Sequence, residues 1–211
     1  MTPKYTKGFS LIELAIALAV LAILAGGTLK GREILLDAKI QSTVVEITSL
    51  ETALTAFESR YAALPGDFSA ASAAGLGTGG NANLKIDSST EESNVWRHLT
   101  RSGFMSGSFD GVVFENGPCP PTTCRTSPLG GTLLISSRIQ LATPGQEQIL
   151  VSMGQAQPAR VLAQLDRRLD DGKPFSGSFQ LLQNSNELCA FDNNLWNEND
   201  NPNCEAAYVL R

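Results

Sequence analysis

The residues of this chain that could do chemistry lie in two places. The first is KGFSLIELAIALAVLAILAGG, in which the Gly8–Phe9 peptide bond precedes a carboxylate, Glu13, at the start of a long apolar run. The second is a set of four cysteines downstream: Cys119, Cys124, Cys189 and Cys204. The sequence contains a single histidine and lacks a nucleophile–base pattern, a metal triad and a phosphate loop. We therefore expect neither enzymatic activity nor a bound cofactor.

Apart from Glu13, the segment 9–29 is apolar enough to lie in the hydrocarbon layer of a membrane. At about 1.5 Å per residue, a helix over 9–29 matches a hydrocarbon layer of about 30 Å. A carboxylate at the centre of a membrane helix costs about 2.5–3.5 kcal/mol, and less near an end. Glu13 is therefore either a carboxylate tolerated at the interface or one with a cationic partner in an assembly. A cut between Gly8 and Phe9 would create that cation, the free amine of Phe9, for the Glu13 of a neighbouring chain.

The position of the cysteines indicates where the bulk of the chain lies. Basic residues on both sides of the apolar run leave its orientation ambiguous. Four downstream cysteines are an even number, which fits disulfides in an oxidising compartment. A zinc site is the alternative, but paired CxxC spacing is missing and His98 is distant from every cysteine in sequence. A secretory signal peptide ending near Gly27 is a second alternative, although the change in character precedes the run, at Lys7-Gly8.

The stretch KGFSLIEL resembles the processing motif of type IV prepilins and type II secretion pseudopilins. That family has a short basic leader ending in Gly, then Phe, then Glu as the fifth residue of the mature chain; here these are Gly8, Phe9 and Glu13. The resemblance implies that a membrane-embedded peptidase cuts after Gly8 and methylates the amine of Phe9. It also implies that Glu13 neutralises that amine between packed subunits.

The resemblance also implies an architecture, partners and a location. We expect an α+β, pilin-like fold, in which a long N-terminal helix, half of it transmembrane, packs on a small antiparallel β-sheet head. The expected parts are a leader (1–8), a transmembrane assembly helix (9–29), an amphipathic helix half (30–62) and a periplasmic or extracellular head (63–211). Expected partners are a prepilin peptidase/methyltransferase, other pilin or pseudopilin subunits, an inner-membrane assembly platform and membrane lipid. The expected location is the bacterial inner membrane and then a pilus or pseudopilus.

The periodicity beyond the apolar run predicts that the helix continues to about residue 62. Apolar residues recur in steps of three or four; they are Leu36, Ile40, Val44, Ile47, Leu50, Leu54, Phe57 and Tyr61. Leu64-Pro65-Gly66-Asp67 should end the helix. Gly26, Gly27 and Gly31 weaken it by about 1 kcal/mol each relative to Ala, so either a bend or a loose membrane exit is expected there.

The segment after the long helix reads as a loop followed by a short helix. Residues 66–88 are rich in Gly, Ala, Ser and Asn, and the Asn and Asp spacing in GTGGNANLKID does not match a calcium loop. Capping-box patterns at Ser88 and Ser89 predict a helix that Gly103 ends. We expect His98 on the surface of that helix.

The rest of the chain predicts strands and one more helix. Strand candidates are 111–115, 132–139, 147–153, 176–182, 187–191 and 206–210. PARVLAQLDRRLDDG reads as a helix with Pro158 near its start and Gly172 after its end. Strands that follow a long helix are typical of an α+β fold in which an antiparallel sheet covers the apolar stripe of the helix.

Four cysteines allow three disulfide connectivities. Cys119 and Cys124 flank Pro120-Pro121, which favours a small local loop, and closing a loop of about 15 residues between Cys189 and Cys204 is worth about 3 kcal/mol. We therefore favour this pairing. The second loop resembles the disulfide-bounded C-terminal loop of many type IV pilins. Its polar residues could hold calcium, as in some pseudopilins, or simply be solvated: Asp192, Asn194, Asn197 and Asp200.

Charge and composition restrict the function further. The chain has 16 basic and 21 acidic residues, a net charge of -5, which argues against binding nucleic acid. The leading hypothesis is a structural pilin-like subunit, a minor pilin or a pseudopilin. The alternative is a membrane-anchored periplasmic binding or adhesion protein that does not polymerise.

Overall fold

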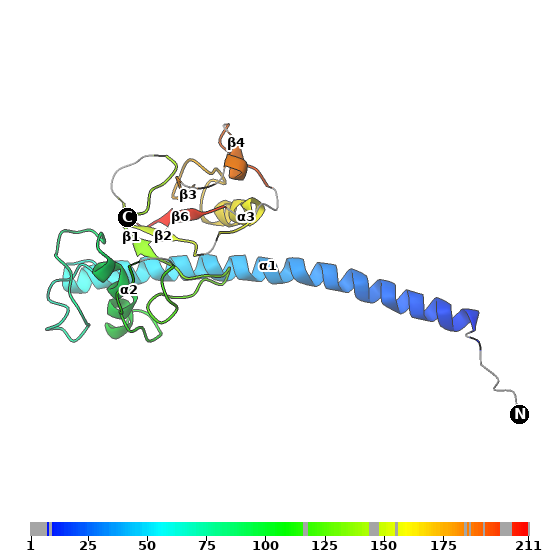
Figure 1. Ribbon diagram of the computed structural model, residues 1–211, viewed down its shortest axis with the longest axis horizontal. Helices are drawn as coiled ribbons and strands as arrows, with labels where there is room; N and C mark the ends of the chain where they lie inside the picture. Colours follow the sequence, from blue (N-terminus) through cyan, green and yellow to red (C-terminus); the bar gives the residue numbers. More distant parts are fainter. Residues whose placement is uncertain are drawn as a thin grey trace, which may run out of the picture. The chain divides into compact units, whose positions relative to one another are not determined.

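The computed structural model describes residues 8, 10–115, 118–143, 148–154, 156–183, 185, 187–191, 193–198 and 204–210. It divides into two compact units, Met1–Lys39 and Ile40–Arg211. We describe each unit by itself, and we call the second unit the head. Helix α1, Leu11–Tyr61, contributes to both units (Figure 1).

The first unit contains the apolar part of α1. This helix is long and apolar enough to cross a membrane, and its apolar window has no burial within the protein. Leu11 is 88% exposed and Ile23 75% exposed, values that are unusual for such side chains in water. The helix continues without interruption through Gly26, Gly27 and Gly31. The predicted long N-terminal helix is thereby confirmed, beginning at Leu11 and ending at Tyr61.

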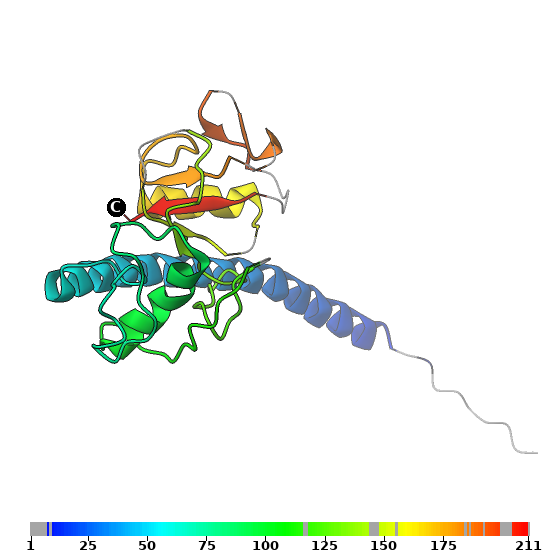
Figure 2. The same cartoon turned by 60° about the vertical axis from the view of Figure 1, so that its left-hand side comes forward.

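The head is built on the second part of α1. The residues of its predicted apolar stripe that are buried here are Ile40, Ile47, Leu50, Leu54 and Phe57. The sheet lies along this part of α1, and α3 lies beside the sheet (Figure 1; Figure 2). The helix ends as predicted, because Pro65 and Gly66 follow it and Ala62 takes a left-handed conformation with φ of 52°.

The main sheet of the head has four short antiparallel strands in the order β1-β2-β6-β3. They are β1 (Ile135–Ser136), β2 (Leu150–Ser152), β6 (Ala206–Val209) and β3 (Phe179–Leu181). The register pairs Leu150 with Val209 and Leu181 with Ala206. On β6, burial and a hydrogen bond to Glu51 of α1 raise the pKa of Tyr208 to about 12. The sheet is therefore tied to the long helix by a polar contact as well as by packing.

A separate hairpin lies near the C-terminus of the chain. It consists of β4 (Ala190–Phe191) and β5 (Leu195–Trp196), and a 3-10 turn, η1 (Glu187–Cys189), precedes it. The strand predicted at 187–191 is thus half strand and half turn. The strand predicted at 111–115 is wrong, because those residues pair with no other strand in the described part of the chain.

Two helices complete the head. Helix α3, Ala159–Leu169, lies within the predicted helical segment. As predicted, Pro158 is near its start, at the N-cap position, and Gly172 follows its end, with φ of 76°. Helix α2, Ser89–Arg101, begins with the Ser88–Glu91 capping box, the first of the two patterns that the sequence offers. Its Trp96 is fully buried and donates its indole N–H to the carbonyl of Leu133, at 3.0 Å. This bond joins α2 to the chain that leads into β1.

The expectation that His98 lies on the surface is wrong. Its side chain is fully buried and stacks on Phe57 of α1, with ring centroids 6.1 Å apart. Its Nδ1 accepts the backbone N–H of Gly66 at 2.9 Å, which leaves Nε2 to donate to the carbonyl of Thr78, also at 2.9 Å. Both partners come from the loop after α1, so sequence periodicity along α2 could not reveal them.

The loop 66–88 is ordered by two buried carboxylates. Asp67 accepts the backbone N–H groups of Asn83 and Leu84, at 3.1 and 2.7 Å. Glu91 accepts the N–H groups of Asn81, Asp87 and Ser88. Buried carboxylates are tolerated where such donors satisfy them. These residues therefore explain how a glycine-rich segment holds one conformation without regular structure.

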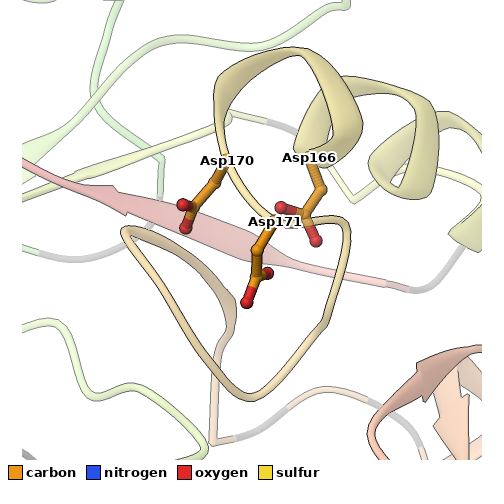
Figure 3. Close-up of side chains that lie close together, drawn as sticks. All are labelled: Asp166, Asp170 and Asp171. Atoms are coloured by element: carbon orange, nitrogen blue, oxygen red, sulfur yellow. The ribbon is translucent and has the colours of Figure 1, made fainter.

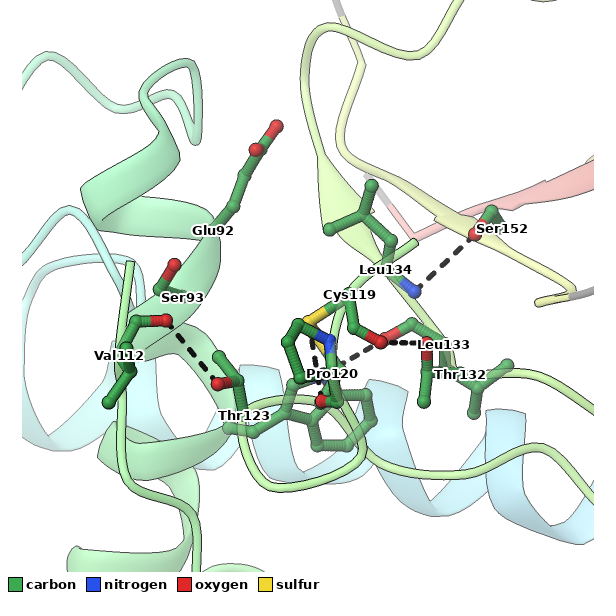
Figure 4. Close-up of a disulfide and its surroundings, with 12 residues drawn as sticks. Glu92, Ser93, Val112, Cys119, Pro120, Thr123, Thr132, Leu133, Leu134 and Ser152 are labelled. Atoms are coloured by element: carbon green, nitrogen blue, oxygen red, sulfur yellow. Dashed lines mark hydrogen bonds between the residues drawn. A yellow bond between two sulfur atoms is a disulfide. The ribbon is translucent and has the colours of Figure 1, made fainter. Parts of the chain in front are cut away.

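Two disulfides close loops in the head, with the pairing that the sequence analysis favoured. Cys119 pairs with Cys124, and Cys189 with Cys204, with Cα–Cα distances of 5.9 and 5.7 Å. No cysteine is free, which removes the zinc interpretation. Around the first disulfide, Thr132 donates its hydroxyl to the carbonyl of Cys119, at 2.6 Å (Figure 4).

The environment of His98 predicts a pH dependence of stability. Burial, and secondarily the charges of Arg97 and Arg101, lower the pKa of His98 from 6.5 to about 4, against the opposing effect of its bond to Thr78. As the pH falls from 6.5 to 4, His98 therefore binds a proton in the unfolded chain but not in the folded chain, and the free energy of unfolding decreases. Relative to His98→Gln, wild type should lose on the order of 3 kcal/mol over this window. Urea unfolding at several pH values measures the difference; parallel pH profiles would contradict it.

The disulfides predict the redox behaviour of the cysteines. Exported protein should resist thiol alkylation until it is reduced and unfolded, and should then take up four labels, measured by intact mass. Replacing Cys189 and Cys204 by Ser should cost about 3 kcal/mol of stability, because the closed loop spans 15 residues. Quantitative labelling of the folded protein without reduction would refute the assignment.

Candidate functional site

The candidate processing site surrounds the start of α1. Gly8 is exposed, and Phe9 lies outside the described residues. Ser10 is the N-cap residue of α1: its carbonyl accepts the N–H of Leu14 at 3.1 Å, and its own N–H donates to Oε2 of Glu13 at 2.9 Å. This is the backward half of a capping box, with Glu13 at the third helical position. The Ser10-x-x-Glu13 pattern is visible in the sequence, but the sequence analysis did not use it.

The surroundings of Glu13 combine a charge with an apolar surface. Glu13 is exposed, and so are the apolar residues of the first turns of α1. An acidic residue in the first turn interacts favourably with the helix dipole, typically by 0.3–1 kcal/mol at an exposed site. The single hydrogen bond from Ser10 leaves the negative charge of Glu13 without a cation in the described part of the chain. Its carboxylate can therefore accept a positively charged partner.

The head contains a cluster of three aspartates at the C-terminal end of α3 (Figure 3). Carboxylate oxygens of Asp166, Asp170 and Asp171 all lie within 4.8 Å of one another, and the three residues differ in burial. Each carboxylate already accepts hydrogen bonds from the protein. Asp170 accepts the N–H groups of Ser178 and Phe179, and thereby fixes the chain that enters β3. The cluster thus has a structural role in the turn between α3 and β3.

Asp166 is the buried member of this cluster. Its Oδ2 accepts the indole N–H of Trp196 at 2.7 Å, and its Oδ1 accepts the N–H of Gly172 at 3.3 Å. Burial raises the pKa of Asp166 to about 6, and the neighbouring charges of Asp171 and Asp170 add to this, while the two hydrogen bonds act in the opposite direction. The Trp196 bond also connects α3 to β5, inside the loop that Cys189–Cys204 closes.

Two of the four polar residues considered as calcium ligands in the C-terminal loop lie in the described part of the chain. Asp192 and Asp200 lie outside the described residues. Asn194 uses its Oδ1 to accept the N–H of Phe175 at 2.9 Å, and Asn197 donates its backbone N–H to the carbonyl of Cys189. The two described members therefore act in local chain contacts, and calcium binding by this loop stays a prediction.

A mainly apolar hollow in the head lies beside β2 and β6. It has a volume of about 210 Å³, and its apolar lining comprises Leu134, Ile139, Met153, Leu162, Leu182 and Ala206. Glu205 is the one ionisable residue that lines it. A nucleophile and a base do not meet there, so the hollow offers no catalytic chemistry.

Comparison with known proteins identifies the N-terminal segment. Residues 3–29 match the family model described as the prokaryotic N-terminal methylation motif, the signature of type IV pilins and pseudopilins. This match includes Gly8, Phe9 and Glu13 and confirms the resemblance drawn from the sequence. Searches of curated proteins and of solved structures found no significant match. The motif indicates a structural, pilin-like protein that is anchored in a membrane.

The raised pKa of Asp166 predicts a second pH effect, opposite in sign to that of His98. Because the folded pKa is about 6 against the usual 3.8, the folded chain holds this proton more tightly, and stability falls as pH rises from 3.8 to 6. Relative to Asp166→Asn, wild type should lose on the order of 3 kcal/mol over this window. Asp171→Asn, at an exposed neighbour, should keep most of the dependence. Chemical denaturation as a function of pH tests both; an unchanged slope in Asp166→Asn would show that Asp166 titrates normally.

Proposed function

We propose that this protein is a pilin-like structural subunit that is cleaved after Gly8, N-methylated on Phe9 and polymerised through its N-terminal helix. The polymer is a type IV pilus or a type II secretion pseudopilus, and the subunit is a minor pilin or a pseudopilin. Before assembly it is held in the bacterial inner membrane by residues 9–29, with the head in the periplasm. Its partners are a prepilin peptidase, other subunits and an inner-membrane assembly platform.

The observation that carries this proposal is the methylation motif at residues 3–29. The structure adds support, because the large apolar residues of α1 from Leu11 to Leu24 are exposed. Such a surface is stable only in lipid or against other apolar helices. A subunit that moves from a membrane into a helical bundle meets both environments.

The charge of Glu13 explains why polymerisation would depend on cleavage. Before the cut, the nitrogen of Phe9 is an uncharged amide and offers Glu13 no cation. After the cut it is an ammonium group, and a buried opposite charge becomes its best partner. An unpaired charge buried between apolar helices is strongly unfavourable, whereas a paired one is tolerated. Pairing Glu13 with the Phe9 amine of a neighbouring subunit therefore favours incorporation of processed subunits.

One observation favours the alternative of an anchored binding or adhesion protein. Three large apolar residues are exposed in and next to the disulfide-closed hairpin: Leu188 is 57%, Phe191 52% and Leu195 51% exposed. A rigid hairpin that presents apolar side chains suits contact with another molecule. Because a pilin-like subunit would polymerise and the anchored alternative would not, a measurement of polymerisation separates the two functions.

The first prediction from this proposal concerns processing. Coexpression with a prepilin peptidase should remove residues 1–8, and intact-mass measurement should show a chain that begins with N-methylated Phe9. Gly8→Ala tests the junction without altering charge and should leave most of the chain uncut. A mature chain that begins after Ala25 or Gly27 would instead identify an ordinary secreted protein.

The second prediction concerns Glu13. Glu13→Ala should leave membrane insertion and cleavage after Gly8 intact, and insertion should become easier because the cost of the carboxylate is removed. Incorporation into the polymer should fail, since the neighbouring ammonium is left unpaired. Glu13→Gln, which keeps the size and an acceptor for Ser10, should also impair assembly.

Crosslinking of neighbouring subunits and recovery of sheared filaments, measured beside the cleavage assay, separate these steps. If both variants are cleaved and assemble like wild type, Glu13 is only a tolerated interface carboxylate. If wild type is cleaved but never enters a polymer, the anchored, non-polymerising protein is the correct alternative.

A further inference from the structure

A strand-like segment of the head has no strand partner. Residues 111–115, GVVFE, are rich in β-branched and aromatic residues, and the structure assigns them no helix, turn or bend. Gly111 has a positive φ of 65°, and none of the four residues that follow it does. Yet within the described chain the backbones of Val113, Phe114 and Glu115 make no hydrogen bond. An extended segment whose backbone groups are unpaired can offer its N–H donors and C=O acceptors to another chain.

The first residue of the extended run determines which edge is free. The N–H of Val112 donates to Oδ1 of Asp110 at 3.0 Å. Its carbonyl lies 3.3 Å from the hydroxyl oxygen of Thr123 (Figure 4), and that hydroxyl also donates to Oδ1 of Asp110 at the shorter distance of 2.8 Å. Both backbone groups of Val112 therefore face Asp110 and Thr123. In an extended chain the next residue points its N–H and C=O the opposite way. The backbone groups of Val113 consequently point away from Thr123, toward the free edge.

The segment is held in place and accessible at once. Thr123 lies in the loop closed by Cys119–Cys124, and a further bond joins the N–H of Asp110 to the carbonyl of Thr122. Val112 is 61% exposed and Val113 46% exposed. A fixed, apolar strand edge loses little conformational freedom on pairing, which favours association.

Two unpaired charges flank the segment at opposite ends. Glu115 is exposed and has no ion pair or hydrogen bond within the described chain. Arg97 of α2 likewise has no ion pair in the described residues. Arg97 lies against Gly111: a Cβ added to Gly111 would be 2.7 Å from Cδ of Arg97 and 3.2 Å from its Nη1. A guanidinium and a carboxylate thus lie near the two ends of one short strand.

We propose that residues 112–115 form an antiparallel strand pair with the same residues of a second copy of this chain, centred on Val113. In that register Val113 faces its own counterpart, Val112 lies opposite Phe114, and Glu115 of each copy lies beside Gly111 of the other. Glu115 of each copy then lies next to the Gly111 that Arg97 of the other copy contacts, which brings together two symmetry-related Arg97–Glu115 pairs.

The observations favour a second copy over an unrelated peptide because the segment is complementary to itself. Reversing the strand about Val113 places apolar residues opposite apolar residues, and the acidic end opposite the arginine. A strand of four residues is far smaller than the interface of a stable complex in solution, which buries about 1,200–2,000 Å². Pairing should therefore require copies that are already concentrated, as in a membrane. This proposal does not depend on cleavage at Gly8 or on the role of Glu13.

Cysteine crosslinking of the full-length chain in membranes tests the register. Val113→Cys should give a disulfide-linked dimer on mild oxidation, because directly opposed residues lie about 5.5 Å apart, within the span of a disulfide. Val112→Cys is a matched control at the same distance from the native disulfide loop; its two copies are offset by about 7–8 Å and should crosslink less. Leu84→Cys, 63% exposed and outside the segment, controls for random collision. Equal yields at all three positions would overturn the proposal.

Charge reversal tests the partner within the Val113→Cys background. Glu115→Arg should lower the dimer yield by at least about fivefold at low salt, because it converts both pairs to repulsion. Adding Arg97→Glu should restore the yield, while Glu115→Gln should give an intermediate value that is insensitive to salt. If Arg97→Glu does not fold, the comparison of Glu115→Arg with Glu115→Gln remains decisive. A yield that is the same for Glu, Gln and Arg at position 115 would refute the self-paired register.

Discussion

The structure depends on the burial of one stripe of one helix. From Ile40 to Phe57, α1 presents apolar side chains that are almost completely excluded from water. Burying each such side chain stabilises the fold by about 1.5–3 kcal/mol, and the strands of the head are too short to form an independent core. The sheet, α2 and the aspartate turn after α3 are positioned around this stripe. In the first unit the large apolar residues of the same helix from Leu11 to Leu24 are exposed, so the stability of that part requires lipid or another helix.

The head compensates for short strands with polar anchors. Aromatic residues make up only 7% of the chain, so packing alone gives limited restraint. Buried carboxylates at Asp67 and Glu91 hold a long loop by accepting backbone N–H groups, and His98 joins that loop to α2 and α1. Each of these groups is costly to bury unless its partners are in place. Long loops can therefore be specific without regular secondary structure.

Charge has a different role at each end of the molecule. In the head, buried ionisable groups are arranged so that the neutral form of His98 is favoured and Asp166 holds its proton tightly, in both cases because burial disfavours the charged form. At the start of α1, the carboxylate of Glu13 accepts one hydrogen bond within the described residues, from the backbone N–H of Ser10. The buried groups His98 and Asp166 of the head favour their neutral forms, whereas the N-terminal segment carries a carboxylate that suits a cationic partner from another chain.

The sequence by itself determined the features that depend on local chemistry. The apolar run, the Gly8–Phe9 junction with Glu13, the boundaries of α3 and the Ser88–Glu91 cap all follow from short-range patterns, and a pairing of cysteines could be favoured from loop length alone. Tertiary structure decided the features that depend on distant partners. His98 is buried because Gly66 and Thr78 reach it from another segment. The predicted strands shrank to two to four residues, and GVVFE paired with nothing, because strand formation requires a neighbour that periodicity along one segment cannot supply.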